Sequence, residues 1–303
     1  MKVFLTAAAG FVGSRLLDDL LAAGHEVTAL AHSDRSLEQL RRLHPELNIA
    51  RGDVTKAGDM LKAVPSGTEA VIYIPGLLRE FPSKGITFRG VHVEGVRNTL
   101  AAARNAGATR WIEMSALGTG PHGKTGYFRT KWEAEELVRS SGMQWTILRP
   151  SVIFDDRPTK LKTFVNEIAK AIRQLPFIPI LGTGKFRLQP VSVDDVSQTI
   201  VQALSKPETI GKTYEIGGPE KLTYTEIVTT IARGLHSKKP KLRIPMVLAE
   251  VAAKLFQRFA FFPFTTDQLT MLKDENIVKD RSREEEWKST FTLPLKRFES
   301  LAG

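Results

Sequence analysis

Short apolar segments alternate with amphipathic segments through the first half of the chain. Each apolar segment is rich in branched and aromatic side chains, which favours a β-strand. The intervening segments repeat apolar residues at helical spacing, and several end just before a glycine, as helices commonly do. The predicted strands are KVFLTA, HEVTALA, LNIARGD, AVIYIPG, RWIEMSA and WTILRP, and the predicted helices are SRLLDDLLAAG, SLEQLRRL, GDMLKAV, VEGVRNTLAAARNAG and TKWEAEELVRSSG.

This alternation of strand and helix predicts a parallel sheet with helices on both faces. We therefore expect an α/β fold with a doubly wound, Rossmann-type NAD(P)-binding domain over residues 1–150. After Pro150 the pattern is less regular: TFVNEIAKAIRQL and VDDVSQTIVQAL predict helices, YEIGG predicts a strand, and the region 222–280 is mostly helical. Residues 151–303 are expected to form a smaller, mostly helical substrate and lid region that returns some elements to the sheet.

Composition narrows the range of chemistry. The chain has 303 residues, 42% of them apolar, which is ample for a large core. It has no cysteine, so disulfides, thiolate catalysis and cysteine-ligated metals are excluded, and a reducing cytoplasm is the expected location. The six histidines are dispersed without metal-ligand spacing, so we expect no metal site. No segment approaches the ~20 apolar residues of a membrane span.

The net charge of +10 has several interpretations: an anionic ligand, nucleic acid or an acidic membrane surface. The basic residues are scattered and no nucleic-acid-binding module is recognisable, so we expect a solvated basic surface and no nucleic-acid partner. A late aromatic stretch contains Phe256, Phe259, Phe261, Phe262 and Phe264. Core packing is the favoured interpretation, and a quinone site or a peripheral membrane contact stays open.

The segment TAAAGFVG joins the first predicted strand to the first predicted helix. A dinucleotide-binding turn occupies this place because it directs a helix N-terminus and its free N–H groups at a pyrophosphate. Gly10 permits close backbone approach, and Gly13 lets the helix pack tightly on the sheet. Ala7 stands where the pattern has its first glycine, which costs little at negative φ and about 1 kcal/mol at positive φ.

A second glycine-rich segment, GTGPHGKT, runs from Gly118 to Thr125. Its letters match both the dinucleotide pattern and the ATP-binding pattern G-x-x-x-x-G-K-T. An ATP-binding loop places Lys and Thr in the first helical turn, whereas this helix is expected to begin near Tyr127. As a dinucleotide turn, the segment lacks a ribose-binding residue at the end of WTILRP. We expect a flexible loop near the active site.

The end of the second predicted strand discriminates between the two nicotinamide cofactors. An acidic residue about twenty positions beyond the turn binds the ribose of NAD, and a cation accommodates the extra phosphate of NADP. In TALAHSDRS the place is taken by His32, with Ser33 and Arg35 close behind, which favours NADP(H) over NAD(H). Asp34 keeps NAD open as the alternative.

The third predicted strand ends in ARGDV. Asp53 and Val54 follow it and are placed near the adenine of a bound dinucleotide. The alternative for Asp53 is to cap the following helix.

Tyr127 and Lys131 in YFRTK lie four residues apart in a predicted helix and therefore on one face. A phenol, with an ordinary pKa near 10, needs a nearby cation to exchange protons at neutral pH. An ammonium and a bound nicotinamide would together lower that pKa by about 3 units. Ser115 in WIEMSALG ends the preceding strand, where it would hold a substrate oxygen. These three are the predicted catalytic residues; the alternative is a packed Tyr127 beside a solvated Lys131.

With these motifs the chain resembles the extended or atypical branch of the short-chain dehydrogenase/reductase superfamily. The resemblance covers almost the whole chain, in the family's order and spacing. Its segments are TAAAGFVG, GDV, VEGVRNTLAAARNAG, SALG, YFRTK, LRPSVIF, PVSVDDV and YEIGGPEKLTYTEI. More narrowly, FVNEIAKAIRQLPFIPILGTGKFRLQPVSVDDV and TTDQLTMLKDENIV are similar to the Rossmann-fold accessory subunit of respiratory complex I and its stand-alone bacterial relatives. In that group the resemblance implies NADPH binding, often without demonstrated turnover.

The resemblance implies roles for individual residues. Tyr127 would be the acid–base residue and would contact the nicotinamide ribose together with Lys131. Two positions depart from the family: Ala7 replaces a glycine, and His92 in VHVEG stands where relatives usually have asparagine, which bears on the family's proton relay. The residues implied to contact the cofactor are Gly10, Phe11, Val12 and Gly13 at the pyrophosphate, Ile74, Pro75 and Gly76 along the groove, and Pro150 and Val152 beside the nicotinamide.

Three functions therefore stay open. The leading one is an NAD(P)-dependent oxidoreductase that moves hydride between nicotinamide and a carbonyl or hydroxyl carbon of a small molecule. The second is a non-catalytic NADPH-binding accessory subunit or redox sensor that docks on another protein. The third is a nucleotide-sugar epimerase or dehydratase, in which the cofactor is reduced and reoxidised in place. Neither the substrate nor the oligomeric state is indicated.

Overall fold

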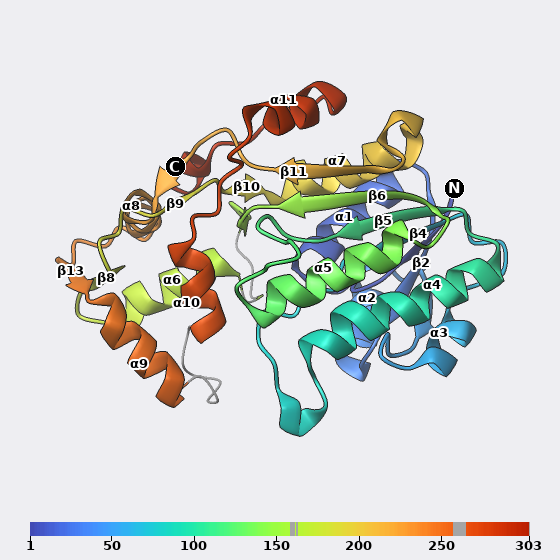
Figure 1. Ribbon diagram of the computed structural model, residues 1–303, viewed down its shortest axis with the longest axis horizontal. Coiled ribbons are helices and arrows are strands. Elements are labelled where there is room, and N and C mark those ends of the chain that lie inside the picture. Colours follow the sequence, from blue (N-terminus) through green and yellow to red (C-terminus); the bar gives the residue numbers. More distant parts are fainter. Residues whose placement is uncertain (158–160, 162, 257–264, 303) are drawn as a thin grey trace.

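The computed structural model describes residues 1–157, 161, 163–256 and 265–302. Figure 1 shows a larger lobe, built on a sheet with helices on both faces, and a smaller, mostly helical lobe. The strands of the large sheet are β1 (Lys2–Leu5), β2 (Glu26–Ala31), β3 (Asn48–Arg51), β4 (Ala70–Tyr73), β5 (Arg110–Met114), β6 (Gln144–Pro150) and β11 (Lys212–Ile216). Within the described ranges this sheet has seven strands in the order β11-β6-β5-β4-β1-β2-β3, and each neighbouring pair is parallel. The doubly wound α/β fold expected from the sequence is confirmed.

Helices cover both faces of this sheet. Two hydrophobic clusters result, because successive side chains of a strand point to opposite faces: Val3 and Leu5 pack in one cluster and Phe4 packs in the other. The first face carries α1 (Phe11–Ala22), α2 (Asp34–Leu43) and α7 (Val193–Ser205), and the second carries α3 (Ala57–Ala63), α4 (Gly95–Ala106) and α5 (Gly126–Arg139). Strands covered on both faces are almost wholly apolar, which explains the continuous hydrophobic runs in the sequence.

The second half of the chain divides between the lobes. β11 joins the large sheet beside β6, and α11 (Arg281–Thr290) places Trp287 in the first cluster. The smaller lobe has its own cluster, which includes Phe154, Ile180 and Tyr224. Its elements are α6 (Phe164–Gln174), β8 (Ile178–Leu181), α8 (Tyr224–Gly234), β13 (Lys241–Ile244), α9 (Met246–Phe256) and α10 (Thr266–Lys273). The short strands β7 (Ile153–Phe154), β9 (Arg187–Leu188), β10 (Val191–Ser192) and β12 (Leu222–Thr223) form additional pairs.

The aromatic stretch after residue 255 is only partly described. Phe256 ends α9 with 42% of its surface exposed, so the expectation of core packing is wrong for this residue. The other aromatic positions of the stretch, Phe259, Phe261, Phe262 and Phe264, lie outside the described residues. No helix in the described ranges combines the length and apolar character that crossing a bilayer requires.

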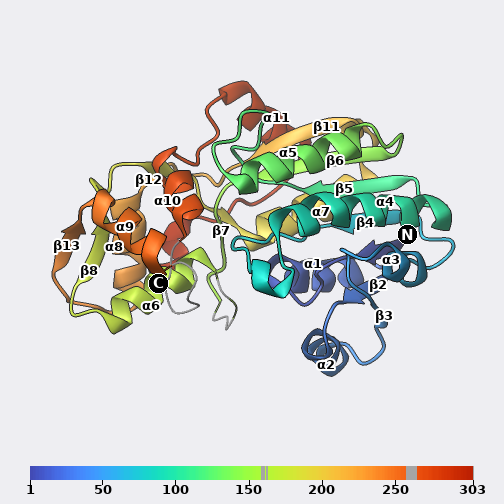
Figure 2. The same cartoon turned by 60° about the horizontal axis from the view of Figure 1, so that its bottom comes forward.

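The strand order reverses between β1 and β4, which is the place where open α/β sheets bind ligands. Thr6 fixes this switch point: its hydroxyl donates to the Ile72 carbonyl at 3.0 Å and accepts from the Ile74 amide at 3.1 Å. The carboxyl ends of the strands point toward the smaller lobe (Figures 1 and 2). The switch point therefore opens on the side where the two lobes meet.

Candidate functional site

The turn between β1 and α1 is shaped by close packing. Gly10 begins α1 as its N-cap, and its amide donates to the Ala7 carbonyl at 2.9 Å. A Cβ atom added to Gly13 would lie 2.1 Å from that same carbonyl oxygen, so only glycine lets the helix approach the turn. This cradle, with the N–H groups of the first turn of α1 at its floor, fits the diphosphate of a dinucleotide.

Ala7 has φ = +52°, the conformation in which alanine is disfavoured relative to glycine. We predict that Ala7→Gly stabilises the protein by about 1 kcal/mol. Gly13→Ala, in contrast, is expected to destabilise it by about 3 kcal/mol through the clash with the Ala7 carbonyl, and to weaken NADPH binding. Urea unfolding and NADPH titration of both variants check this, and a shift of both stabilities in the same direction would contradict the assigned geometry.

Lys131 is buried at the carboxyl end of the sheet, with only 1% of its surface exposed. Its ammonium donates to the Met114 carbonyl at 2.8 Å and to the Pro75 carbonyl at 3.1 Å. It thereby ties α5 to the end of β5 and to the segment that follows β4. Ser115, buried and directly after Met114, has its hydroxyl 3.3 Å from that of Thr119. The alternative of a solvated lysine is therefore wrong.

Glu113, which the sequence analysis missed, lies behind this lysine on β5. It is fully buried, and its Oε1 lies 4.0 Å from Lys131 Nζ. Oε2 accepts from the indole of Trp111 at 3.1 Å, whereas Oε1 has no hydrogen-bond partner within the part of the chain that the structure describes. Burial raises the pKa of Glu113, and burial lowers the pKa of Lys131 against the attraction of Glu113. A glutamate inside a buried strand was the available signal, because an acidic residue is rarely buried without a partner.

Tyr127 lies on the same face of α5 as Lys131 and is also buried. Its ring makes edge contacts with His92, Phe128 and Phe88 at centroid distances of 5.3, 5.6 and 5.9 Å. Burial raises the pKa of its hydroxyl above the ordinary value. This direction is opposite to the lowering expected from a neighbouring lysine, because the Lys131 ammonium is directed at two carbonyl groups and the tyrosine loses its hydration.

His92 lies in a π-helical segment, Arg89–Glu94, that leads into α4. Its Nε2 accepts from the Leu77 amide at 3.3 Å, and its Nδ1 lies 2.9 Å from the Thr130 hydroxyl. Since that hydroxyl donates to the Gly126 carbonyl at 2.9 Å, Nδ1 must be the protonated nitrogen. Burial lowers the pKa of His92 to about 2, so the ring stays neutral. His92 therefore connects the π-helical segment to the segment that contains Leu77 and to α5. It does not exchange protons near neutral pH.

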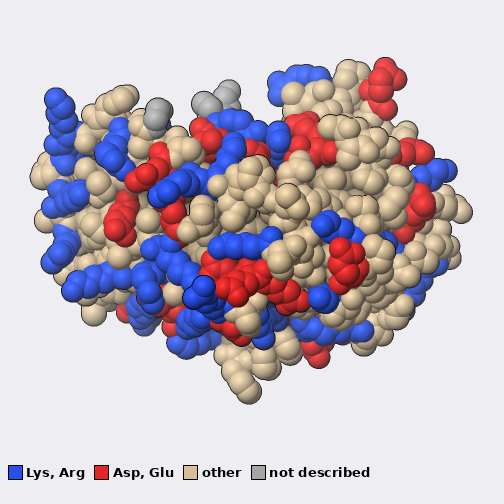
Figure 3. Space-filling model, turned by 90° about the horizontal axis from the view of Figure 1, so that it is seen from above, with Lys and Arg blue, Asp and Glu red and all other residues tan. Residues whose placement is uncertain are grey.

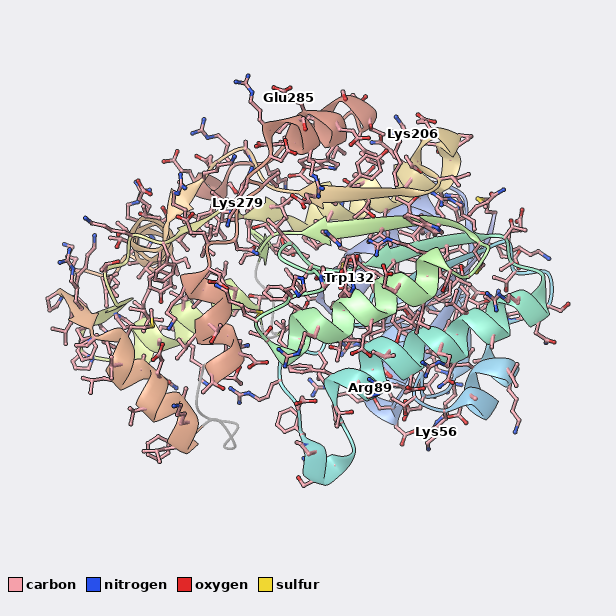
Figure 4. All side chains as sticks on the ribbon, in the orientation of Figure 1. Lys56, Arg89, Trp132, Lys206, Lys279 and Glu285 are labelled. Atoms are coloured by element: carbon pink, nitrogen blue, oxygen red, sulfur yellow. The ribbon has the colours of Figure 1, made fainter. Side chains whose placement is uncertain are left out.

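The outer side of α5 is held by charged and aromatic contacts. Figure 4 labels Trp132 on α5 and Arg89 at the start of the π-helical segment. Arg89 binds Glu133 at 2.8 Å, which joins the two elements. The guanidinium of Arg149, on β6, lies 5.7 Å from the ring centre of Trp132. These contacts fix the helix that carries Tyr127 and Lys131.

The residues predicted to select the cofactor lie at the ends of β2 and β3. His32 and Arg35 are exposed, and Ser33 caps α2 by accepting from the Ser36 amide. Asp34, the alternative NAD ligand, is paired with Arg51 at 2.8 Å. Arg51 ends β3 and was missed, because only the fold brings the ends of neighbouring strands together.

Asp53 is engaged within its own loop. Its Oδ1 accepts from the amide and the hydroxyl of Thr55 at 2.9 and 2.8 Å. The N-cap of α3 is Lys56, so Asp53 does not cap that helix. Val54, half-buried beside it, accepts from Asn98 through its carbonyl.

The other residues predicted to contact the cofactor lie after β4 and at the end of β6. Ile74 is buried, Pro75 is half-buried and Gly76 is exposed after β4. Pro150 ends β6, and its carbonyl accepts from the Leu117 amide at 2.9 Å. The structure therefore brings Ser115, Tyr127 and Lys131 to these strand ends, whereas His32, Ser33, Arg35, Asp53 and Val54 lie at the ends of β2 and β3.

Asn276 connects the segments that follow β5 and β6, and the sequence analysis also missed it. Its Oδ1 accepts from the Ser151 hydroxyl at 2.7 Å and from the Val152 amide at 3.0 Å. Its Nδ2 donates to the Leu117 carbonyl at 3.0 Å. A residue 124 positions beyond Val152 thus fixes the two segments that contain Leu117 and Val152.

The GTGPHGKT segment does not form an ATP-binding loop. Thr125 is the N-cap of α5 and accepts from the Phe128 amide at 3.2 Å, so neither it nor Lys124 lies within the helix. Lys124 is paired with Asp274. A Cβ atom at Gly118 or Gly123 would lie 2.9 or 2.7 Å from the Phe128 side chain. Gly118 therefore leaves room for the Phe128 ring, and Gly123 leaves room for the start of α5.

A family model described as NAD(P)H-binding matches residues 7–207. The chain is 28% identical to subunit 9 of the mitochondrial NADH dehydrogenase (ubiquinone) 1 alpha subcomplex from Arabidopsis thaliana, over 91% of this chain and 70% of that protein. The Mus musculus subunit of the same name is 29% identical, over 86% of this chain and 68% of its own length. The crystal structure of a UDP-glucose 4-epimerase from Thermotoga maritima with UDP-glucose is similar in fold, with a TM-score of 0.74, 16% identity and coverage of 100% of this chain and 96% of that chain.

Proposed function

The chain belongs to the NAD(P)H-binding family, and on this premise we propose that it is an oxidoreductase of the extended short-chain dehydrogenase/reductase superfamily, which its sequence resembles. The proposed reaction moves hydride between a nicotinamide and a carbonyl or hydroxyl carbon of a small molecule. The observation that carries the proposal is the buried Lys131, held by the Pro75 and Met114 carbonyls directly beside Ser115 and one helical turn from Tyr127.

In this mechanism the protein's residues bind and orient the substrate oxygen. Ser115 donates its hydroxyl to that oxygen, and Tyr127 gives or takes its proton. A bound oxidised nicotinamide supplies the hydride acceptor and a positive charge that favours the phenolate. Because burial raises the pKa of Tyr127, this added charge and the Lys131 ammonium are both needed for proton exchange at neutral pH. The apolar cluster of Phe88, Tyr127 and Phe128 excludes water from the reacting atoms.

We propose NADP(H) as the cofactor, because Arg35 and Arg51 lie at the ends of β2 and β3 and Arg51 is paired with Asp34. Arg51 neutralises Asp34, the residue that would otherwise accept from the ribose hydroxyls of NAD. NADPH is expected to bind at least about tenfold more tightly than NADH. Arg51→Ala removes a cation and releases Asp34, so it should weaken NADPH binding about tenfold and leave NADH binding equal or tighter.

Calorimetric titration with both nucleotides tests this. The matched control is Arg41→Ala, an exposed arginine in the last turn of α2, which should change neither affinity. Equal affinity of the unmodified protein for both nucleotides would refute the NADP preference, and failure of both to bind at millimolar concentration would refute the oxidoreductase itself.

A second candidate is an accessory subunit or redox sensor that binds NADPH without turnover and docks on another protein. The names of the Arabidopsis and mouse relatives and the raised pKa of Tyr127 favour it. A nucleotide-sugar epimerase or dehydratase would instead purify with tightly held cofactor and cause no net redox change. Mass analysis of the cofactor in freshly purified protein separates that case.

A carbonyl compound or a quinone is the proposed substrate class. The lack of cysteine supports a cytoplasmic location.

A further inference from the structure

The outward face of α9 carries four large aliphatic side chains. Val247, Leu248, Val251 and Leu255 are 68, 61, 49 and 59% exposed. At about 3.6 residues per turn, they fall within about a third of the helix circumference. Isolated apolar residues are ordinary on a protein surface, whereas a contiguous group marks an interaction site. We call these four residues the α9 stripe.

The α9 stripe is not the side on which the helix packs. Met246, Ala249 and Ala253 lie on the other side and contact the hydrophobic cluster of the smaller lobe. Ala253 is fully buried there. The helix therefore has one apolar side that serves the fold and a second apolar side that the fold leaves in contact with solvent.

Exposed basic residues lie on α9 and on the strand that precedes it. Lys254 lies on α9 itself, and Lys241 and Arg243 lie on β13, which Pro245 joins to the helix. None of these three forms an ion pair with any residue that the structure describes, whereas the acidic Glu250 is already paired with Lys273 at 2.6 Å. In Figure 3, Lys and Arg predominate at the end of the molecule where β13 lies in Figure 1. The segment from residue 233 to residue 256 carries Arg233, Lys238, Lys239, Lys241, Arg243 and Lys254 against Glu250.

We propose that α9 and β13 form a docking surface for a bilayer that contains anionic phospholipids. The α9 stripe enters the boundary between headgroups and acyl chains, and the three unpaired cations lie among the lipid phosphates. An aliphatic surface alone would fit a protein partner equally well. The unpaired cations beside it favour an anionic lipid surface, because they complement its charge. Docking by this face would bring the protein to membrane-dissolved substrates without a membrane span.

Co-sedimentation of the full chain with lipid vesicles tests the proposal. Vesicles of phosphatidylcholine with about 30% phosphatidylglycerol should bind at least about tenfold more protein than vesicles of phosphatidylcholine alone, and added salt should weaken the binding. Leu248→Glu/Val251→Glu should reduce binding at least about tenfold, because it removes apolar area and adds negative charge. Lys241→Glu/Arg243→Glu should abolish the preference for anionic vesicles.

The matched control is Leu61→Glu, which changes a leucine that is 51% exposed on α3, in the other lobe. It should bind vesicles as the unmodified protein does, and unchanged NADPH affinity in all variants would verify the fold. Equal binding to both kinds of vesicle, or unchanged binding of the Leu248→Glu/Val251→Glu variant, overturns the proposal. So does a dimer that needs Leu248 in the absence of vesicle binding, which would assign the surface to a second copy of the chain.

Discussion

Tyr127→Phe is expected to lower the rate of carbonyl reduction by NADPH about 10²- to 10⁴-fold, the usual contribution of a general acid. Phenylalanine keeps the ring that contacts His92, Phe88 and Phe128, so the fold should be retained. Only the hydroxyl is lost, and with it the proton donated to the substrate oxygen. The rate is measured as NADPH oxidation with each aldehyde, ketone or quinone that the unmodified protein reduces.

The control for this substitution is Tyr224→Phe. Tyr224 is also a buried tyrosine, on α8 in the smaller lobe, and burial raises its pKa as well. Its replacement should leave the rate unchanged. A Tyr127→Phe protein with the full rate would eliminate Tyr127 as the acid. NADPH binding without oxidation by any carbonyl compound would instead favour the accessory-subunit candidate.

The arrangement of β-strands and helices in the first half of the chain could be predicted because it depends on local patterns. The segment AVIY is buried at every position in β4, as a strand covered on both faces must be. Tyr127 and Lys131 share a face because four residues make about one helical turn. The order of the motifs also predicted a turn between the first strand and the first helix, where the structure has Gly10 as the N-cap of α1.

The site residues that the sequence analysis did not find depend on contacts between distant segments. Glu113 meets Lys131 only because β5 packs under α5, and Arg51 meets Asp34 only because β3 lies beside β2. Asn276 reaches Val152 from 124 residues away. The sequence also left the sign of φ at Ala7 open, since that sign follows from how the turn accommodates α1. Neither spacing nor composition carries this information.

The exposed side of α9 is another feature that the sequence alone does not predict. A helix that is apolar on most sides is expected to be buried. Whether the second side is buried depends on which other elements pack against it. In this structure Val247 and Leu248 stay exposed. The apolar pattern therefore predicts the helix but does not predict which of its sides is buried.

Lys131→Met is expected to destabilise the protein strongly at alkaline pH and little at acid pH. The substitution leaves Glu113 buried without its counter-ion, which costs about 3–5 kcal/mol if the carboxylate stays charged. Glu113 avoids this by keeping its proton, because burial already raises its pKa and the loss of Lys131 removes the charge that lowers it. Above the ordinary pKa of 4.5, the folded variant holds a proton that the unfolded chain releases. Its stability must therefore fall as pH rises, by up to about 1.4 kcal/mol per unit.

The double variant Lys131→Met/Glu113→Gln separates the charge of this pair from its packing. Glutamine can still accept from the Trp111 indole but does not titrate, so most of the stability at pH ~8 should return and the fall in stability between pH ~5 and pH ~8 should disappear. Urea unfolding at pH ~5 and pH ~8 measures both effects, with Lys124→Met, an exposed lysine, as the control that should show neither. A single variant equally destabilised at both pH values would mean that Glu113 does not titrate against Lys131. Since Lys131 and not Glu113 makes the proposed contact with the nicotinamide ribose, NADPH binding should be weak in both variants, even where stability has recovered in the double variant.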